Sequence, residues 1–208
     1  MKILAFSDLH DEEAAFESLS NFAPKFDFVF ACGDLTISVS FAERILAEIP
    51  NCYVITGNWD NESVNRFLES KKQFVHEKRI QLTDSELNVV GFGFSNPTPY
   101  GTFGELSEEE IYGRMSKLHI DSNTLLMLHC PPKGYFDHAR GRPIGSESIL
   151  KIIEEKKPFA AFFGHVHAHQ GVQLLGPTTL IKLPPANEFR AASIEITNKS
   201  ISVQFISL

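Results

Sequence analysis

Two closely spaced histidines follow an apolar run late in the chain. Residues 159–164 lead directly into His165, Val166 and His167. On an extended backbone, residues two positions apart lie on the same side, so both imidazoles should point the same way. A pair of neutral imidazoles at a strand end is typical of sites for zinc, iron or nickel ions. By itself such a pair is more often an ordinary loop feature, and the metal interpretation depends on the rest of the chain.

Four other apolar runs also end in side chains that can bind metal ions. The runs cover residues 2–6, 26–32, 52–56 and 124–128, and they are followed by Asp8 and His10, Asp34, Asn58, and His129. Taken singly, Asp34 and Asn58 could be ordinary turn residues after glycine, and His129 could be a core histidine hydrogen-bonded to the backbone. With His165 and His167 they supply oxygen and nitrogen ligands without a thiolate. That set favours two divalent metal ions over a structural zinc site.

The first half of the chain reads as strands joined by helices. Helices are predicted over residues 11–22, with Asp11 as N-cap, over 40–48, with Ser40 as N-cap, and over 62–71. The β-α-β-α-β order implies parallel strands joined by right-handed crossovers. The carboxyl ends of parallel strands gather at one edge of a sheet, where ligands bind. We therefore expect the seven candidate ligands to lie together, although they are distant in the sequence.

The second half of the chain does not continue the regular alternation of strands and helices. Short strands are predicted over residues 74–82 and 87–94, followed by a loop rich in Pro, Gly and Thr over 95–104. A capping box at Ser107 begins a helix that ends near residue 118, and Ser146 begins another that ends near 156. From Val172 onward the pattern predicts antiparallel strands. The long loop is of a kind that is often functional, and its aromatic residues suit a pocket lid or a homodimer contact.

The composition is that of an ordinary globular protein. With 208 residues, 43% hydrophobic and 22% charged, the chain has the size of a single domain over residues 1–208. Its net charge of −7 argues against a nucleic-acid or anionic membrane partner. No apolar run is long enough to span a membrane, and Asp8 comes too early for a signal peptide. Three cysteines outside any C-x-x-C spacing fit buried free thiols, so we expect a reducing, cytoplasmic location.

Five short motifs carry a resemblance to a known superfamily. They are Asp8-Leu9-His10, Gly33-Asp34, Gly57-Asn58, His129 and Gly164-His165-Val166-His167, in this order along nearly the whole chain. The pattern resembles the calcineurin-like metallophosphoesterase superfamily. The stretches SNPTPYGT at residues 95–102 and HCPPKG at 129–134 look like a subgroup of small prokaryotic predicted phosphoesterases. The resemblance implies an α/β fold, a four-layer α/β/β/α sandwich of two mixed sheets, which is the metallo-dependent phosphatase fold.

The resemblance also implies a role for each candidate ligand. One metal ion would be bound by Asp8, His10, Asp34 and His167, and a second by Asp34, Asn58, His129 and His165. Asp34 would bridge two ions about 3.5–4 Å apart, and its negative charge would offset their repulsion. The implied reaction is hydrolysis of a phosphodiester or a small phosphomonoester by a metal-bridged hydroxide, with Asp34 and Asn58 as catalytic residues. The two divalent ions would be Mn, Fe, Zn or Ni.

The chain departs from the superfamily pattern at residue 59. The third motif usually carries His after Asn, and that His is thought to protonate the leaving group, whereas this chain has Trp59. A general acid typically contributes about 10²–10⁴-fold, so substrates with poor leaving groups should turn over weakly. Three residues are candidates to replace the missing acid: Asp60, by orienting a water, His138 and His169. The sequence does not select among them.

Contacts to the small phosphoester substrate are expected from loops next to the motifs. The candidates are Asn96, Thr98, His138, Arg140, Arg142 and His169. Arg140 and Arg142 would reach a second phosphate or the remote end of the substrate. A solvated loop is the competing interpretation for both arginines.

Two other functions fit parts of the same pattern. Some members of the superfamily are scaffolds for protein partners, and they too lack the His at position 59. Such scaffolds tend to lose metal ligands, whereas every expected ligand position is filled here. A third hypothesis is a DNA nuclease, and the net negative charge of the chain argues against it. The sequence therefore favours a metal-dependent phosphoesterase, with a catalytically weak scaffold as the alternative.

Overall fold

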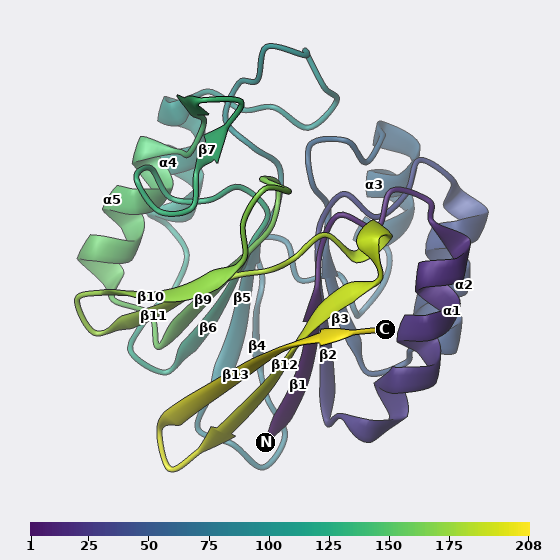
Figure 1. Cartoon of the computed structure of the whole chain (residues 1–208). Helices are drawn as coiled ribbons and strands as arrows, with labels where there is room; N and C mark the ends of the chain where they lie inside the picture. The colour runs from purple at the N-terminus through teal and green to yellow at the C-terminus, as the bar shows by residue number, and fades with distance from the viewer.

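Two large β-sheets face each other in the computed structural model, which describes residues 1–208 (Figure 1). The first sheet has the order β13 (Ser200–Ser207), β12 (Arg190–Thr197), β1 (Lys2–Phe6), β2 (Phe28–Cys32) and β3 (Cys52–Ile55). The second has the order β10 (Gly171–Leu175), β11 (Thr178–Lys182), β9 (Ala160–Phe163), β6 (Thr124–Leu128), β5 (Asn88–Phe92) and β4 (Arg79–Gln81). A separate hairpin is formed by β7 (His138–Ala139) and β8 (Arg142–Pro143).

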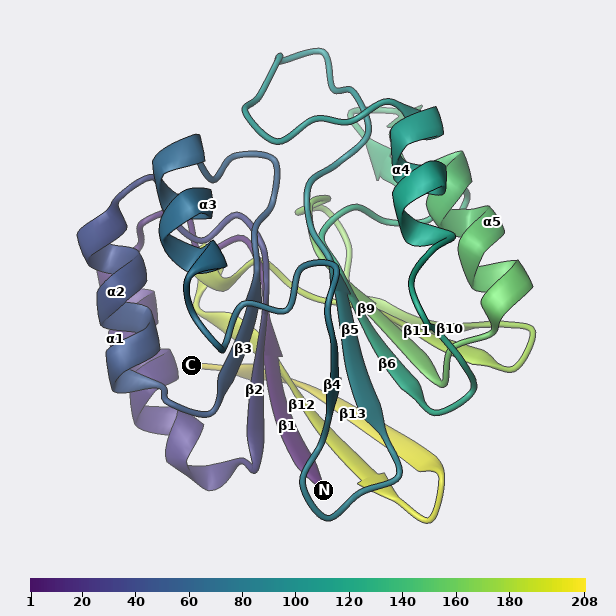
Figure 2. The same ribbon diagram turned by 180° about the vertical axis from the view of Figure 1, so that it is seen from behind.

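Helices cover the outer face of each sheet, as the two opposite views show (Figure 1, Figure 2). The first sheet is covered by α1 (Glu13–Phe22), α2 (Val39–Glu48) and α3 (Glu62–Glu69), and the second by α4 (Glu108–Met115) and α5 (Glu147–Lys156). Two short 3-10 helices are η1 (Ala23–Lys25) and η2 (Ala186–Glu188). The expected four-layer α/β/β/α sandwich is thus confirmed. None of the helices has both the length and the hydropathy that crossing a bilayer requires.

Three apolar clusters separate the four layers. Along β1, Leu4 belongs to the cluster under the helices, whereas Ile3 belongs to the cluster between the sheets. Phe30 on β2 meets Phe162 on β9 between the sheets, with ring centroids 5.3 Å apart. Because both faces of these strands are buried, their sequences read as continuous apolar runs. All three cysteines are buried and free, as predicted.

The parallel strands place their carboxyl ends at one edge of the molecule. β1, β2 and β3 run parallel, as do β5, β6 and β9 in the other sheet. The tail differs in part from the antiparallel expectation. β10 and β11 are antiparallel, as are β12 and β13, but β11 pairs parallel with β9. The reason is that the chain first enters β10 at the sheet edge and returns as β11 beside β9.

The predicted helix starts are shifted because other polar side chains act at these positions. Asp11 does not cap α1, since its carboxylate accepts a hydrogen bond from the Thr36 hydroxyl instead. Ser38, and not Ser40, caps α2, with its Oγ 3.4 Å from the backbone nitrogen of Phe41. The capping box of α4 and the N-cap of α5 are confirmed.

The predicted strand over residues 74–82 is mostly irregular, because the chain here passes from one sheet to the other. Only β4 pairs within a sheet, alongside β5. Phe74 forms an isolated bridge to Val54 of β3, and His76 forms one to Gly91 of β5. The segment therefore joins the two sheets next to the edge where the candidate ligands lie.

Candidate metal centre

The polar residues that follow the strands meet at one edge as two clusters. Asp8 and His10 follow β1, Asp34 follows β2, Asn58 follows β3, His129 follows β6, and His165 and His167 follow β9. The first cluster comprises Asp8, His10 and His167, and the second comprises Asp34, His129 and His165. Within each cluster, the ligand atoms lie within 4.8 Å of one another.

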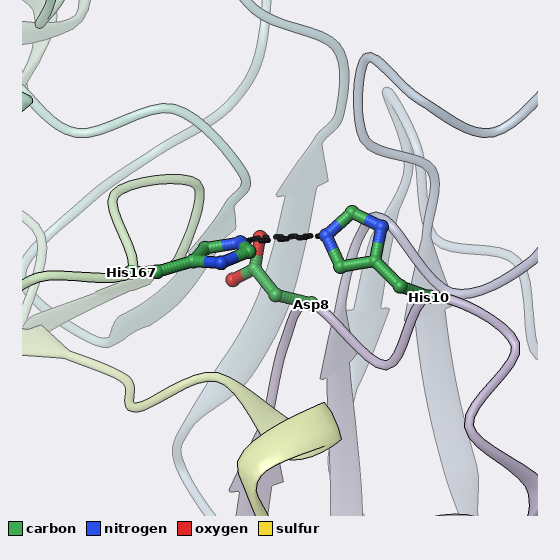
Figure 3. Close-up of side chains that lie close together, drawn as sticks. All are labelled: Asp8, His10 and His167. Atoms are coloured by element: carbon green, nitrogen blue, oxygen red, sulfur yellow. Dashed lines mark hydrogen bonds and ion pairs between the residues drawn. The ribbon is translucent and has the colours of Figure 1, made fainter.

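In the first cluster, two imidazole rings and a carboxylate face one another (Figure 3). His167 Nε2 lies 3.3 Å from His10 Nε2 and 3.2 Å from Asp8 Oδ1. His10 Nε2 lies 3.9 Å from the same oxygen. Two imidazole nitrogens and one carboxylate oxygen aimed at a common point form a donor set typical of a divalent transition-metal ion.

In the second cluster, the ring of His129 is central and fully buried. Its Nε2 lies 3.3 Å from Asp34 Oδ1 and 3.0 Å from Asn58 Oδ1. Nδ1 of His165 lies 3.2 Å from the same nitrogen. His129 Nδ1 donates to the Cys32 carbonyl oxygen at 2.9 Å. A bond of this kind orients a histidine ring and leaves its other nitrogen for a metal ligand.

Asp34 lies between the two clusters. Its Oδ2 is 3.8 Å from His10 Nε2, and its Oδ1 is 3.3 Å from His129 Nε2. The backbone nitrogen of Trp59 donates to Oδ1 at 2.8 Å. The residue is only 4% exposed, so the carboxylate is oriented by its neighbours and not by solvent. One oxygen of Asp34 therefore faces each cluster.

The histidine pair does not lie on an extended backbone, so that prediction was wrong. β9 ends at Phe163, and His165 has a left-handed backbone with φ of 68°. The turn sends the two rings apart, with His165 in the second cluster and His167 in the first. The period-two argument fails because the strand ends before the first histidine.

Three other candidate ligands share this unusual backbone conformation. Asp8, His10 and Asp34 have φ values of 58°, 48° and 53°. Residues other than glycine rarely adopt a left-handed conformation, because Cβ approaches the following carbonyl oxygen. Strain of this kind is concentrated at functional sites, where surrounding contacts maintain it.

Two glycines allow the ligand loops to approach closely. A Cβ at Gly57 would collide with Oδ1 of Asp34. A Cβ at Gly164 would collide with Oγ of Ser7 and would lie 2.5 Å from Oδ2 of Asp8. Both positions therefore require a residue without a side chain.

The family of the chain follows from a comparison with known sequences. A family model described as calcineurin-like phosphoesterase matches residues 1–169. The chain belongs to this family. It is therefore a hydrolase of phosphoric esters that depends on divalent metal ions, which confirms the resemblance seen in the motifs.

Relatives of this phosphoesterase match over most of their length. An uncharacterized protein of Methanocaldococcus jannaschii is 30% identical over 202 residues, which cover 91% of this chain and 90% of the relative. A crystal structure from Thermus thermophilus matches with a TM-score of 0.76 and 17% identity, over 98% of this chain and 97% of that one. A dimetal phosphatase from Danio rerio matches with a TM-score of 0.61 and 11% identity, over 100% and 98%. At these identities, the two structures show the fold alone.

Asp60 of the phosphoesterase orders the ligand loops and does not orient a water as considered from the sequence. Its Oδ2 accepts from the backbone nitrogens of Asp34 and Gly57 at 2.9 and 2.6 Å. Its Oδ1 accepts from those of Leu35 and Thr36 at 2.7 and 2.8 Å. Both oxygens are thus occupied by backbone donors, and the side chain joins the loop after β2 to the loop after β3.

Replacing Asp60 by Asn should lower the free energy of unfolding by about 2–4 kcal/mol, because the amide nitrogen cannot accept hydrogen bonds. Whichever position that nitrogen takes, two buried N–H groups lose their acceptor. Urea unfolding of the metal-free proteins measures the difference. The matched control is Asp84→Asn, at an exposed turn. Equal stability of the Asp60→Asn variant and the wild type would contradict the role assigned to this carboxylate.

Sequence reasoning missed two residues that orient Asn58. Asn58 Nδ2 donates to the hydroxyl of Thr102 at 2.8 Å, and that hydroxyl donates to Oε1 of Glu105. The Thr98 hydroxyl donates to the same oxygen at 2.6 Å. Because Nδ2 is occupied, Oδ1 of Asn58 is turned toward His129. In the sequence, the only signal for Thr102 and Glu105 was their position in or next to the loop that was predicted to be functional.

The pKa values of several residues in the two clusters are strongly shifted. Burial disfavours the charged form of Asp8, yet its contact with His167 and the charge of His129 hold the pKa of its carboxyl well below the usual range. Burial also works against a charged His129, but Asp34 and Asp8 raise its pKa to about 9. Burial and the charge of His129 lower the pKa of His165 to about 4. A metal ion at the second cluster would therefore displace a proton from His129 at neutral pH.

A cavity of about 690 Å³ opens beside His165 and His167. Its other lining residues are Thr98, Pro99, Tyr100, Ala139, Arg140, Arg142, Ile144, Val166 and Ala168. Three of the six residues expected to contact the substrate, Thr98, Arg140 and Arg142, thus line this cavity. The remaining three, Asn96, His138 and His169, are not among the lining residues. The Asn96 side chain accepts from the Cys130 thiol, and His138 Nδ1 lies 3.0 Å from Asp137 Oδ1.

Proposed function

We propose that this phosphoesterase binds two divalent metal ions and hydrolyses a phosphodiester or a small phosphomonoester. The first ion would be bound by Asp8, His10, Asp34 and His167, and the second by Asp34, Asn58, His129 and His165. The observation that carries the proposal is the position of Asp34, which directs one buried oxygen toward each cluster. The name of the Danio rerio relative, a dimetal phosphatase, supports the count of two.

The donor set fits ions of borderline softness. It contains four imidazoles, two carboxylates and one amide oxygen, without a thiolate, which suits Mn, Fe, Zn or Ni. When bound, such ions activate the attacking water and withdraw charge from the phosphate oxygens. The role of the chain is to hold seven ligands in place through strained loops, the Asp60 carboxylate and the Thr102–Glu105 pair.

Trp59 stands where a general acid would be expected. Its indole packs edge-on against His10, with ring centroids 4.9 Å apart and an angle of 73°. An indole N–H is not acidic at neutral pH, so the leaving group must depart without a proton from this residue. The site therefore favours esters whose leaving group is already stable as an anion, such as a phenolate.

Replacing Trp59 by His should raise the turnover of substrates with an alkyl leaving group by about tenfold or more, since a general acid contributes about 10²–10⁴-fold where it is well placed. Glycerophosphoethanolamine is a suitable substrate, with p-nitrophenyl esters for comparison. The variant should lose this gain as the pH rises above the pKa of the new His. Trp59→Phe is the control, because it removes the indole without adding an acid. An unchanged rate on the alkyl substrate would count against the idea.

The proposed reaction is tested with bis-p-nitrophenyl phosphate, whose leaving group needs no acid. Protein stripped with a chelator should be inactive and should recover turnover with Mn²⁺, with about two ions bound per chain. His165→Ala should lose that turnover, whereas His119→Ala should keep it, because His119 is exposed and pairs with Asp121 away from the clusters. At limiting Mn²⁺ the rate should fall in acid, since protons compete for the imidazoles.

If the protein is a scaffold, a different result is expected. The wild type should then bind two Mn²⁺ ions but turn over no diester, and His165→Ala should change only the binding of metal. That result would refute the proposed hydrolysis while leaving the family assignment intact.

A further inference from the structure

Two arginines at the cavity beside the metal clusters have no carboxylate partner. The chain contains seven arginines, and Arg44, Arg66, Arg79 and Arg114 each form an ion pair with Asp or Glu. Arg140 and Arg142 line the cavity and form none, although the net charge of the chain is −7. Acidic residues are thus abundant, yet none neutralises these two guanidinium groups. Both arginines line the same cavity as His165 and His167.

The two arginines lie on one short hairpin, with Arg140 in its turn and Arg142 at the start of β8. Ala139 pairs with Arg142 across the β7–β8 hairpin, so the turn consists of Arg140 and Gly141. Both have left-handed backbones, with φ of 50° and 78°. This two-residue turn favours Asn or Gly at its first position, and Arg carries a conformational cost there. The turn therefore fixes the backbone position of Arg140 beside the cavity.

Tyr100 forms part of the cavity wall next to Arg140. The guanidinium carbon of Arg140 lies 6.0 Å from the centre of the Tyr100 ring. The Tyr100 backbone nitrogen donates to the Thr98 hydroxyl, which connects this wall to the Glu105 network beside Asn58. A guanidinium over an aromatic face keeps its in-plane N–H groups free for an anion. The wall and the cation therefore form one recognition surface.

We propose that Arg140 and Arg142 bind a second phosphate group, so that the substrate is a phosphoester of nucleotide size that carries two phosphates. The inference rests on the proposed function, because the first phosphate would occupy the metal clusters. Two guanidinium groups that line one cavity match the double charge of a phosphate monoester better than the single charge of a carboxylate. A cavity of about 690 Å³ has room for the organic group between the phosphates.

The test compares two substrates that differ only in the second phosphate. They are the p-nitrophenyl ester of thymidine 5′-phosphate and the same ester with an added 3′-phosphate, so the bond that breaks is identical. For the Mn²⁺-loaded wild type, kcat/KM should favour the 3′-phosphorylated ester by on the order of tenfold or more, mainly through KM. In Arg140→Gln/Arg142→Gln the ratio should fall to about one. Arg190→Gln, which alters the remaining unpaired arginine outside the cavity, should keep the wild-type ratio.

Binding separates a failure of this inference from a failure of the proposed hydrolysis. Calorimetry compares thymidine 3′,5′-bisphosphate with thymidine 5′-phosphate on the Mn²⁺-loaded proteins, whether or not either ester is hydrolysed. Tighter binding of the bisphosphate to the wild type, lost in the double variant and weakened by salt, supports the second subsite. Equal binding of the two compounds to the wild type would overturn it, as would a preference that survives the double substitution. Thermal unfolding establishes that the double variant is folded.

Discussion

Replacing Asp34 by Asn should abolish metal-dependent turnover, with a loss in kcat/KM of at least about 10²-fold, since loss of a group that only orients a metal ligand already costs about 10–100-fold. The carboxylate directs one oxygen toward each cluster, 3.8 Å from His10 Nε2 and 3.3 Å from His129 Nε2. An amide has a single oxygen and no charge, so one of the two clusters would face a nitrogen that cannot bind a cation. We expect fewer than two Mn²⁺ ions per chain as well as the loss of activity.

The same substitution should leave the fold intact, which separates a site effect from unfolding. Burial opposes the charge on Asp34, and although His129 lowers the pKa of this carboxyl, Asp8 acts in the opposite direction. The pKa is lowered overall, so a neutral amide loses the attraction of His129 as well as these two unfavourable contributions, but its oxygen can still accept the hydrogen bond from the Trp59 backbone nitrogen. Thermal unfolding of the metal-free variant should therefore resemble that of the wild type. Asp84→Asn is the matched control for activity. Full turnover by the Asp34→Asn variant would refute the bridging role.

Replacing Gly57 by Ala should lower kcat/KM by about 10²-fold, because a displacement of about 1 Å at a reacting site has that effect. The added Cβ would collide with Oδ1 of Asp34 and would lie 2.5 Å from its backbone nitrogen. Asp34 is buried and its oxygens are oriented by neighbours, so it has no free space to move into. The collision therefore displaces the residue that lies between the clusters, or the loop that carries Asn58.

Gly113→Ala is the matched control for this substitution, since a Cβ at Gly113 meets nothing within 4 Å. That change lies in α4, where alanine is the better helix former, and it should keep full activity. Each of the two variants differs from the wild type by one added methyl group. Equal activity of both would show that the loop after β3 tolerates a side chain, and it would contradict the close approach that the structure shows.

The layers and the gathering of the ligands were predictable because they depend on local patterns and on simple topology. Continuous apolar runs such as residues 124–128 indicate strands buried on both faces, and helices between them imply parallel neighbours. The boundaries were less predictable where two polar residues compete for one role. Ser38 caps α2 in place of Ser40, and Asp11 is engaged by Thr36. Both choices depend on contacts with residues from other loops.

The roles of Asp60, Thr102 and Glu105 were not predictable from local patterns. Asp60 looks like one more residue in a turn, and its four backbone donors come from two different loops. Thr102 and Glu105 are distant in sequence from Asn58, which they orient. Each of these contacts forms only after the strands have brought the loops together.

The order of strands and helices was enough to predict that seven side chains meet at one edge of the sandwich, because parallel strands align their carboxyl ends whatever their loops do. The family was also predictable, because its motifs are short stretches of consecutive residues. The division of the ligands between two sites was expected from the family resemblance, whereas the contacts that orient them, such as those of Asp60 and Thr102, became visible only in the folded structure. The direction of a side chain after a strand depends on left-handed turns such as that at His165, and these are stabilised by contacts between loops far apart in the chain.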